Sequence, residues 1–217
     1  MSRGTVHSGT GAAARAVLSI RSQAFPADRS PTMRLALPLL FAAALAAPAL
    51  ARAQSAAPAQ PVNFNVPEAA AADVASVDAI VAALYDVISG PVGQARDWNR
   101  LRSLFVPGGR MMPVGRRADG GSGMRMLQVN DYVAMSGQLL VEKGFHEREL
   151  ARRSERFGDI AHVFSTYEGR IEGEAGAMRG INSIQLMHDG RRWWIVSLMW
   201  QAEGHGVQLP AEYLPRG

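Results

Sequence analysis

Residues 178–202 read MRGINSIQLMHDGRRWWIVSLMWQA, and this stretch decides the fold. Apolar and polar residues alternate on both sides of Asp189-Gly190, a dipeptide typical of a two-residue hairpin turn. We therefore expect antiparallel strands over about 178–188 and 192–202. A tight turn also sets which side chains face each other across the hairpin, so it predicts that Asn182 pairs with Ser197.

The same alternation extends back to Phe145 and predicts two more strands, over about 145–156 and 160–170, joined at Gly158-Asp159. Before Phe145 the apolar residues recur at helical spacing. Three helices are expected: one capped by Ser76 and ended by Gly90-Pro91, a short one from about Asp97, and one from Asn130 to about Lys143. Helices followed by a curved antiparallel sheet predict an α+β fold.

The predicted register places polar residues on the sheet face that the helices are expected to cover. These candidates for a ligand pocket are Arg152, Ser165, Tyr167, Asn182 and Ser197. Buried polar groups need partners, and a ligand is one kind of partner. Arg152 would suit an anionic or carbonyl-bearing molecule. The alternative is that these side chains bond to one another, to Asp131 or to Tyr132, with no ligand.

The opposite face is expected to carry Trp194, Val196, Leu198 and Trp200. A monomer rarely exposes an apolar patch of that size, so we predict that a second copy of the chain covers it and forms a homodimer. The alternative is that the C-terminal tail, about residues 207–214, folds back over the same face.

Residues 33–53 have the pattern of a secretory signal peptide. Arg34 precedes an uncharged apolar run from Leu35 to Leu50, and Ala51-Arg52-Ala53 fits the cleavage signal. The run is short for a membrane anchor and contains two prolines. We therefore expect a periplasmic or secreted protein without a stable membrane span after cleavage. Residues 1–32 are either a transit-like segment or lie before the true start at Met33.

The expected organisation is a leader over 1–53, a proline- and alanine-rich disordered linker over 54–72 and one domain over 73–217. The chain carries a net charge of +4, but six arginines and a single acid lie in residues 1–54. The remainder holds 17 basic and 18 acidic residues, so a nucleic-acid partner is not expected.

Several kinds of chemistry lack support. The chain has no cysteine, which excludes thiol nucleophiles and thiolate metal sites. It has no GxSxG, HExxH or dinucleotide fingerprint, and no cofactor is expected.

His146 and Glu147 point to opposite faces of a strand, so we expect no metal site and a solvated, charged strand. His162 is expected opposite Glu155, as an acid–base pair or, more simply, a cross-strand ion pair.

The order of elements resembles the nuclear-transport-factor-2-like superfamily, which includes ketosteroid isomerases and related polyketide cyclases. The resemblance spans about Asp73 to Glu203 and rests on segments 179–186, 189–196 and 200–203. It implies a cone-shaped domain with a pocket between sheet and helices, but no catalytic assignment transfers to this chain. Three functions stay open: an exported binder of a small apolar or anionic molecule, an isomerase-, cyclase- or dehydratase-type enzyme, and a protein-interaction module.

Overall fold

The computed structural model describes residues 66–117 and 119–215. The leader, its signal peptide and most of the linker lie outside the described residues, so their predictions stay untested. None of the helices in the described ranges is long and apolar enough to span a bilayer.

The helices begin and end where the local sequence indicates. They are α2 (Ala71–Val74), α3 (Val77–Ile88), α4 (Trp98–Leu104) and α5 (Val129–Lys143). Ser76 and Asp97 cap α3 and α4 through their side chains, as predicted. The cap of α5 is Gln128 rather than Asn130, because Gln128 and Asp131 form a reciprocal capping box.

Seven strands form one mixed sheet in the order β2-β1-β7-β6-β5-β4, with β3 pairing β1. Their bounds are β1 Phe105–Arg116, β2 Ser122–Met124, β3 Leu127–Gln128, β4 Phe145–Phe157, β5 Ile160–Ile171, β6 Met178–His188 and β7 Trp193–Ala202. The α+β class is confirmed. The sheet is not wholly antiparallel, because β1 pairs with β7 in parallel. Such a pairing leaves no hairpin signal in the sequence.

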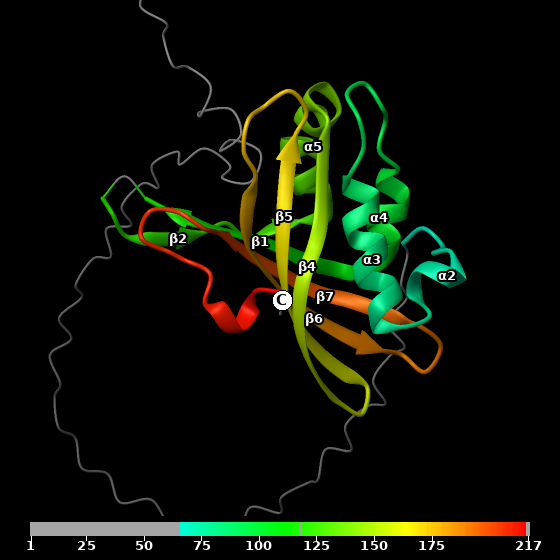
Figure 1. Cartoon of the computed structure of the whole chain (residues 1–217). Helices are drawn as coiled ribbons and strands as arrows, with labels where there is room; N and C mark the ends of the chain where they lie inside the picture. The colour runs from blue at the N-terminus through cyan, green and yellow to red at the C-terminus, as the bar shows by residue number, and fades with distance from the viewer. Residues whose placement is uncertain (1–65, 118, 216–217) are drawn as a thin grey trace, which may run out of the picture. The chain divides into compact units, whose positions relative to one another are not determined.

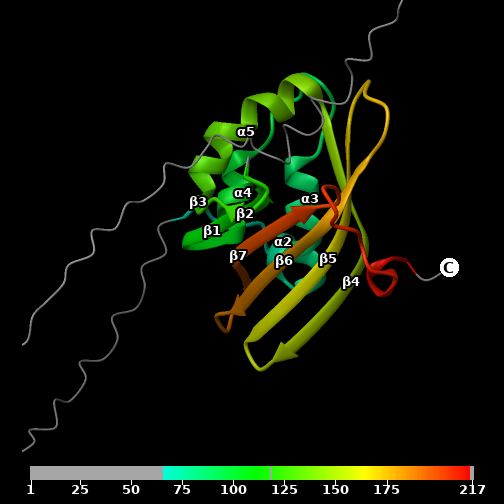
Figure 2. The same ribbon diagram turned by 90° about the vertical axis from the view of Figure 1, so that its left-hand side faces the viewer.

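The sheet is curved, and its two faces are covered differently. Helices α3, α4 and α5 lie against one face, and the C-terminal segment with the 3₁₀ helix η1 (Ala211–Tyr213) lies on the other side, beside β4 (Figure 1, Figure 2). The helix-covered face is called the inner face here. The core under the helices includes Ala161, Val163, Leu186, Trp193 and Ile195.

The register of the β6–β7 hairpin differs from the prediction. The connection has four residues rather than two, because His188 pairs with Trp193 and the Asp189 Oδ1 accepts the backbone N–H groups of Arg191 and Arg192. A β-bulge then follows between Gln185 and Leu186. Asn182 consequently pairs with Trp200, so the predicted Asn182–Ser197 pair is wrong.

A second bulge, in β4, changes the sheet face to which the side chains before it point. Near the turn the prediction is correct, since Glu155 pairs with His162. Between Glu149 and Ala151 the register shifts and leaves Leu150 unpaired. This extra residue turns Glu147 and Glu149 to the inner face. The interpretation of residues 146–149 as a solvated, charged strand is therefore wrong for Glu147 and Glu149, whereas His146 and Arg148 are exposed to solvent.

The predicted tryptophan patch does not form. Leu198 and Trp200 are buried on the inner face because of the β6–β7 bulge. Trp194 is also buried, with the Arg192 guanidinium 3.6 Å from its ring centroid and its Nε1 donating to Asp189. The homodimer stays a prediction, but Trp200 cannot belong to its surface.

The C-terminal tail occupies another part of the outer face. The Tyr213 ring packs edge-on against Phe164, with ring centroids 5.1 Å apart. Thr166 Oγ1 donates to the Tyr213 carbonyl oxygen at 2.6 Å, and Arg153 donates to the Glu212 carbonyl oxygen at 3.0 Å. The tail therefore folds back over β4 and β5, close to the alternative weighed from the sequence.

Candidate functional site

A pocket lies between the inner face of the sheet and helices α3 and α5. It leaves about 440 Å³ of space between atoms, part of which is open solvent, and it is narrow. Its apolar wall consists of Leu84, Ile88, Met111, Phe145, Leu198 and Trp200. Its polar residues are Tyr132, Glu147 and Asn182. The described residues that line it include no lysine, arginine or histidine.

Glu147 is held in the pocket by its backbone as well as by the β4 bulge. Its N–H donates to Ser89 Oγ at 2.9 Å, and Ser89 follows directly after α3. Ser89 Oγ in turn donates to the Tyr85 carbonyl oxygen at 2.7 Å. Gly90 and Phe145 exchange two backbone hydrogen bonds beside this contact. The end of α3 and the start of β4 are thereby tied together, which fixes the position of Glu147.

The Glu147 carboxylate has an unusual environment for an acid. It accepts a hydrogen bond of 3.1 Å from Asn182 Nδ2, and the described residues offer it no cationic partner. Burial raises the pKa of Glu147 to about 7, although the Asn182 bond pulls this pKa down. A carboxyl group with a pKa near neutrality can both take up and release a proton at physiological pH.

Two tyrosines lie close to this carboxylate and stay protonated at neutral pH. Tyr132, from α5, packs edge-on against Trp200, with ring centroids 6.1 Å apart. Tyr85, from α3, accepts a hydrogen bond of 3.1 Å from Asn182 Nδ2. Burial, together with the negative charge of Glu147, raises the pKa of both hydroxyl groups. Each hydroxyl is therefore a hydrogen-bond donor and not a phenolate.

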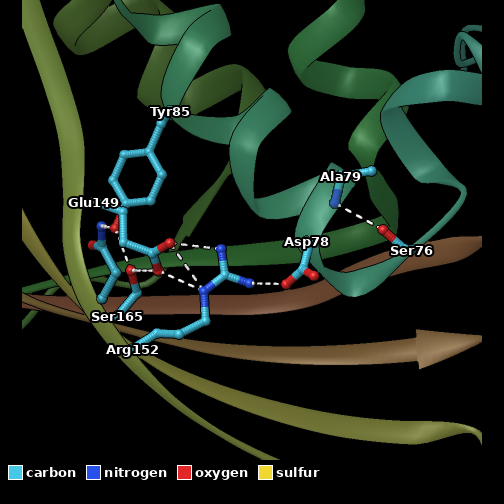
Figure 3. Close-up of polar contacts among 8 residues, drawn as sticks. Ser76, Asp78, Ala79, Tyr85, Glu149, Arg152 and Ser165 are labelled. Atoms are coloured by element: carbon cyan, nitrogen blue, oxygen red, sulfur yellow. Dashed lines mark hydrogen bonds and ion pairs between the residues drawn. The ribbon is translucent and has the colours of Figure 1, made fainter.

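A chain of polar contacts leads from the pocket to the surface. The Tyr85 hydroxyl lies 2.7 Å from Ser165 Oγ, and Ser165 Oγ donates to Glu149 Oε1 at 2.5 Å. Arg152 binds both oxygens of Glu149 and reaches Asp78 Oδ1 at 2.6 Å (Figure 3). Arg152 is thereby neutralised by two carboxylates and does not line the pocket.

The structure brings together some of the sequence-predicted site residues. Asn182 lines the pocket, and Ser165 reaches it through Tyr85. Tyr167 is fully buried against Gly180, and its hydroxyl has no hydrogen-bond partner among the described residues. Ser197 pairs with Gln185 and Arg110 and lies away from the pocket. The predicted set is therefore divided between pocket, polar chain and outer face.

Four residues of this site were not among the pocket candidates from the sequence: Tyr85, Tyr132, Glu147 and Trp200. The helical spacing is compatible with Tyr85 and Tyr132 facing the core, but their proximity to Asn182 and Glu147 depends on tertiary packing. Glu147 and Trp200 were assigned to the wrong face, because strict alternation cannot show a bulge.

None of the histidines in residues 66–117 and 119–215 lines this pocket. His162 Nε2 lies 3.0 Å from Ser183 Oγ, on the outer face, so the proposed acid–base pair with Glu155 has no place in the site. His146 Nε2 lies 2.9 Å from Glu172 Oε1 and points away from Glu147. The described residues contain no cluster of metal-ligating side chains.

No family model matches the sequence, and no curated protein matches it. Solved structures are similar in arrangement. One is an NTF-2 like protein of unknown function from Silicibacter pomeroyi, 20% identical, covering 59% of this chain and 94% of that protein, with a TM-score of 0.41. Another of the same description, from Shewanella baltica, is 14% identical and covers 59% and 98%, with a TM-score of 0.37.

A third solved structure is a hypothetical protein with a ketosteroid isomerase-like fold from Catenulispora acidiphila, in complex with trimethylamine. It is 20% identical and covers 56% of this chain and 83% of that protein, with a TM-score of 0.35. The helices packed into a curved, open sheet, with the pocket between them, agree with the expectation from the sequence. In arrangement the chain is similar to these nuclear-transport-factor-2-like and ketosteroid isomerase-like structures. This likeness concerns the fold alone, so function must be argued from the pocket.

Proposed function

We propose that the pocket binds a small, uncharged, largely apolar molecule and that Glu147 transfers a proton to or from it. The observation that carries this proposal is the Glu147 carboxyl group in an apolar pocket that no described cation lines. Burial there raises the pKa of this group to about 7. A carboxyl group in such a pocket favours the enzyme among the three functions that the sequence left open.

The chemistry that fits is proton abstraction next to a carbonyl group. Ionised Glu147 would take a proton from the carbon, the C–H electron pair would form a C=C bond, and the carbonyl oxygen would gain the negative charge. The Tyr132 hydroxyl, which is protonated and belongs to a residue lining the same pocket, would donate to that oxygen. In a ketone with a C=C bond between its β and γ carbons, the electron pair spreads to the γ carbon as a dienolate. Return of the proton from Glu147 to that γ carbon restores the C=O bond, leaves the C=C bond between the α and β carbons and completes an isomerisation.

The ligand is proposed to be uncharged because of where the cations lie. Arg152, which the sequence suggested for an anionic ligand, is held by Glu149 and Asp78 outside the pocket lining. A carboxylate ligand would meet the ionised Glu147 with no compensating charge, which is costly in an apolar site.

Hydrogen exchange provides a test that does not need the natural substrate. The full chain is incubated in deuterated buffer with 1-tetralone or cyclohexanone, and deuterium uptake beside the carbonyl is followed by mass spectrometry. We expect uptake above the uncatalysed rate, rising with pH with a midpoint near 7. Replacing Glu147 with Gln should lower the catalysed rate about 100-fold or more.

The matched control is Glu155→Gln, an exposed glutamate on the same strand, which should exchange deuterium as the parent does. Equal rates for parent and Glu147→Gln would overturn proton transfer. Ketones that raise the melting temperature without any exchange would instead support the non-catalytic binder.

Export is proposed on the pattern of residues 33–53 alone. Expression in a bacterial host, followed by N-terminal sequencing of the periplasmic or secreted fraction, tests it. A mature chain that starts at Gln54 supports export, and an uncleaved cytoplasmic chain contradicts it.

A further inference from the structure

The polar chain from Asn182 to Glu149 has a fixed direction. Glu149 is paired through both carboxylate oxygens with Arg152 and can only accept hydrogen bonds. Ser165 Oγ has a single proton, which it uses to donate to Glu149. The 2.7 Å contact between Ser165 and Tyr85 therefore requires the Tyr85 hydroxyl to donate.

The same reasoning reaches the pocket. Tyr85 has spent its only proton on Ser165, so its oxygen must accept from Asn182. The nitrogen of the Asn182 amide, and not its oxygen, must then face Tyr85. This same Nδ2 lies 3.1 Å from Glu147 Oε1 and 3.1 Å from the Tyr85 oxygen, so each of its two protons has an acceptor.

We propose that Glu149 is a positioning residue for Glu147: acting through Ser165 and Tyr85, it fixes the Asn182 amide so that a donor and not an acceptor faces the pocket carboxylate. With the donor in place, Glu147 is favoured in its ionised form, the form that removes a proton. The catalytic benefit of this arrangement rests on the proposed function, but the orientation of the amide and its effect on Glu147 can be measured without any substrate.

Reversal of the amide would have the opposite effect. If Asn182 Oδ1 faced Glu147, the carboxyl group would have to keep its proton to make a hydrogen bond. The other titratable groups close to Glu147 are the hydroxyls of Tyr85, Tyr132 and Tyr167, which are neutral. None of them brings a positive charge that would favour the ionised form of Glu147.

The test is the titration of the Glu147 carboxyl carbon by nuclear magnetic resonance in the full chain, assigned with Glu147→Gln. In Ser165→Ala the Tyr85 hydroxyl loses its acceptor and can donate to the Asn182 oxygen, which turns the amide. We expect the Glu147 midpoint to rise by about one pH unit, the size expected for one hydrogen bond to a charged group.

The double variant Ser165→Ala/Tyr85→Phe separates positioning from general damage. It has no hydroxyl left to turn the amide, so the Glu147 midpoint should return to the parent value. Asp78→Asn is the control, because Asp78 contacts Arg152 but none of the four residues Glu149, Ser165, Tyr85 and Asn182 that orient the amide. It should leave the midpoint unchanged.

An unchanged midpoint in Ser165→Ala, or a raised midpoint that persists in the double variant, would overturn the proposal. If Ser165→Ala does not fold, the orientation of the Asn182 amide is measured in the unaltered chain. The two Asn182 amide protons should show contacts to Tyr85 and to Glu147, and an amide with its oxygen towards both contradicts the inference. The Glu147 titration midpoint could shift in the variants as expected while the protein catalyses no deuterium exchange. That result would contradict the proposed reaction and would still support Glu149 as a positioning residue.

Discussion

At the scale of single residues, the buried carboxyl group of Glu147 lowers the stability of the fold when it is ionised. A raised pKa means that the folded state binds the proton more tightly than the unfolded chain does. The free energy of unfolding should therefore fall as the pH rises from about 4.5 to about 7, and the loss should persist above pH 7. A site that costs stability is common where a group serves chemistry.

Glu147→Gln should accordingly stabilise the protein at alkaline pH. The amide keeps the contact with Asn182 without a buried charge, so we expect a gain of at most about 3 kcal/mol at pH 8 and almost none at pH 4. Urea unfolding at both pH values measures the difference. Glu155→Gln, exposed to solvent, should not reproduce this dependence on pH. A variant that is no more stable than the parent at pH 8 would argue against a buried charge.

At the scale of elements, close packing between strands explains why β6 has a glycine at position 180. A Cβ atom there would lie 2.3 Å from the Gln201 carbonyl oxygen and 2.6 Å from the Tyr167 hydroxyl. We expect Gly180→Ala to lower the free energy of unfolding by about 3 kcal/mol, measured in urea. Gly158→Ala, in an open turn with positive φ, should cost only about 1 kcal/mol. Similar costs for both would contradict this account.

The elements also show what could be predicted from the sequence. The helices around Ser76 and Asp97 and the four long strands were found from periodicity and capping residues, which are local signals. The bulges at Leu150 and between Gln185 and Leu186 could not be predicted in this way. An extra residue in a strand is accommodated by its tertiary contacts, which the alternation of polar and apolar residues does not show. Asn182 lies on the inner face, as expected from the alternation. Glu147 was expected to face solvent because the alternation does not show the bulge at Leu150.

At the scale of the whole molecule, the C-terminal tail completes the outer face of the sheet. Its Tyr213 covers Phe164, and its backbone carbonyl oxygens receive bonds from Thr166 and Arg153. We expect Tyr213→Ala to lower the free energy of unfolding by about 1–2 kcal/mol, through the lost ring contact and buried area.

The control for the tail is Glu212→Ala. Arg153 uses the backbone oxygen of Glu212, and the Glu212 side chain is not needed for that bond. Calorimetry of the two variants should therefore show a lower melting temperature for Tyr213→Ala alone. If both variants melt with the parent, the tail contributes nothing to the fold.

The β4 bulge turns Glu147 to the inner face, the β6–β7 bulge adds Leu198 and Trp200 to the pocket wall, and we propose that the carboxyl group held there transfers a proton. The most direct measurement is the titration of the Glu147 carboxyl carbon in the unaltered full chain. The account predicts a midpoint near 7, well above the 4.5 of an ordinary glutamate. A midpoint at the ordinary value would show that Glu147 faces water and would contradict both the pocket and the proposed reaction.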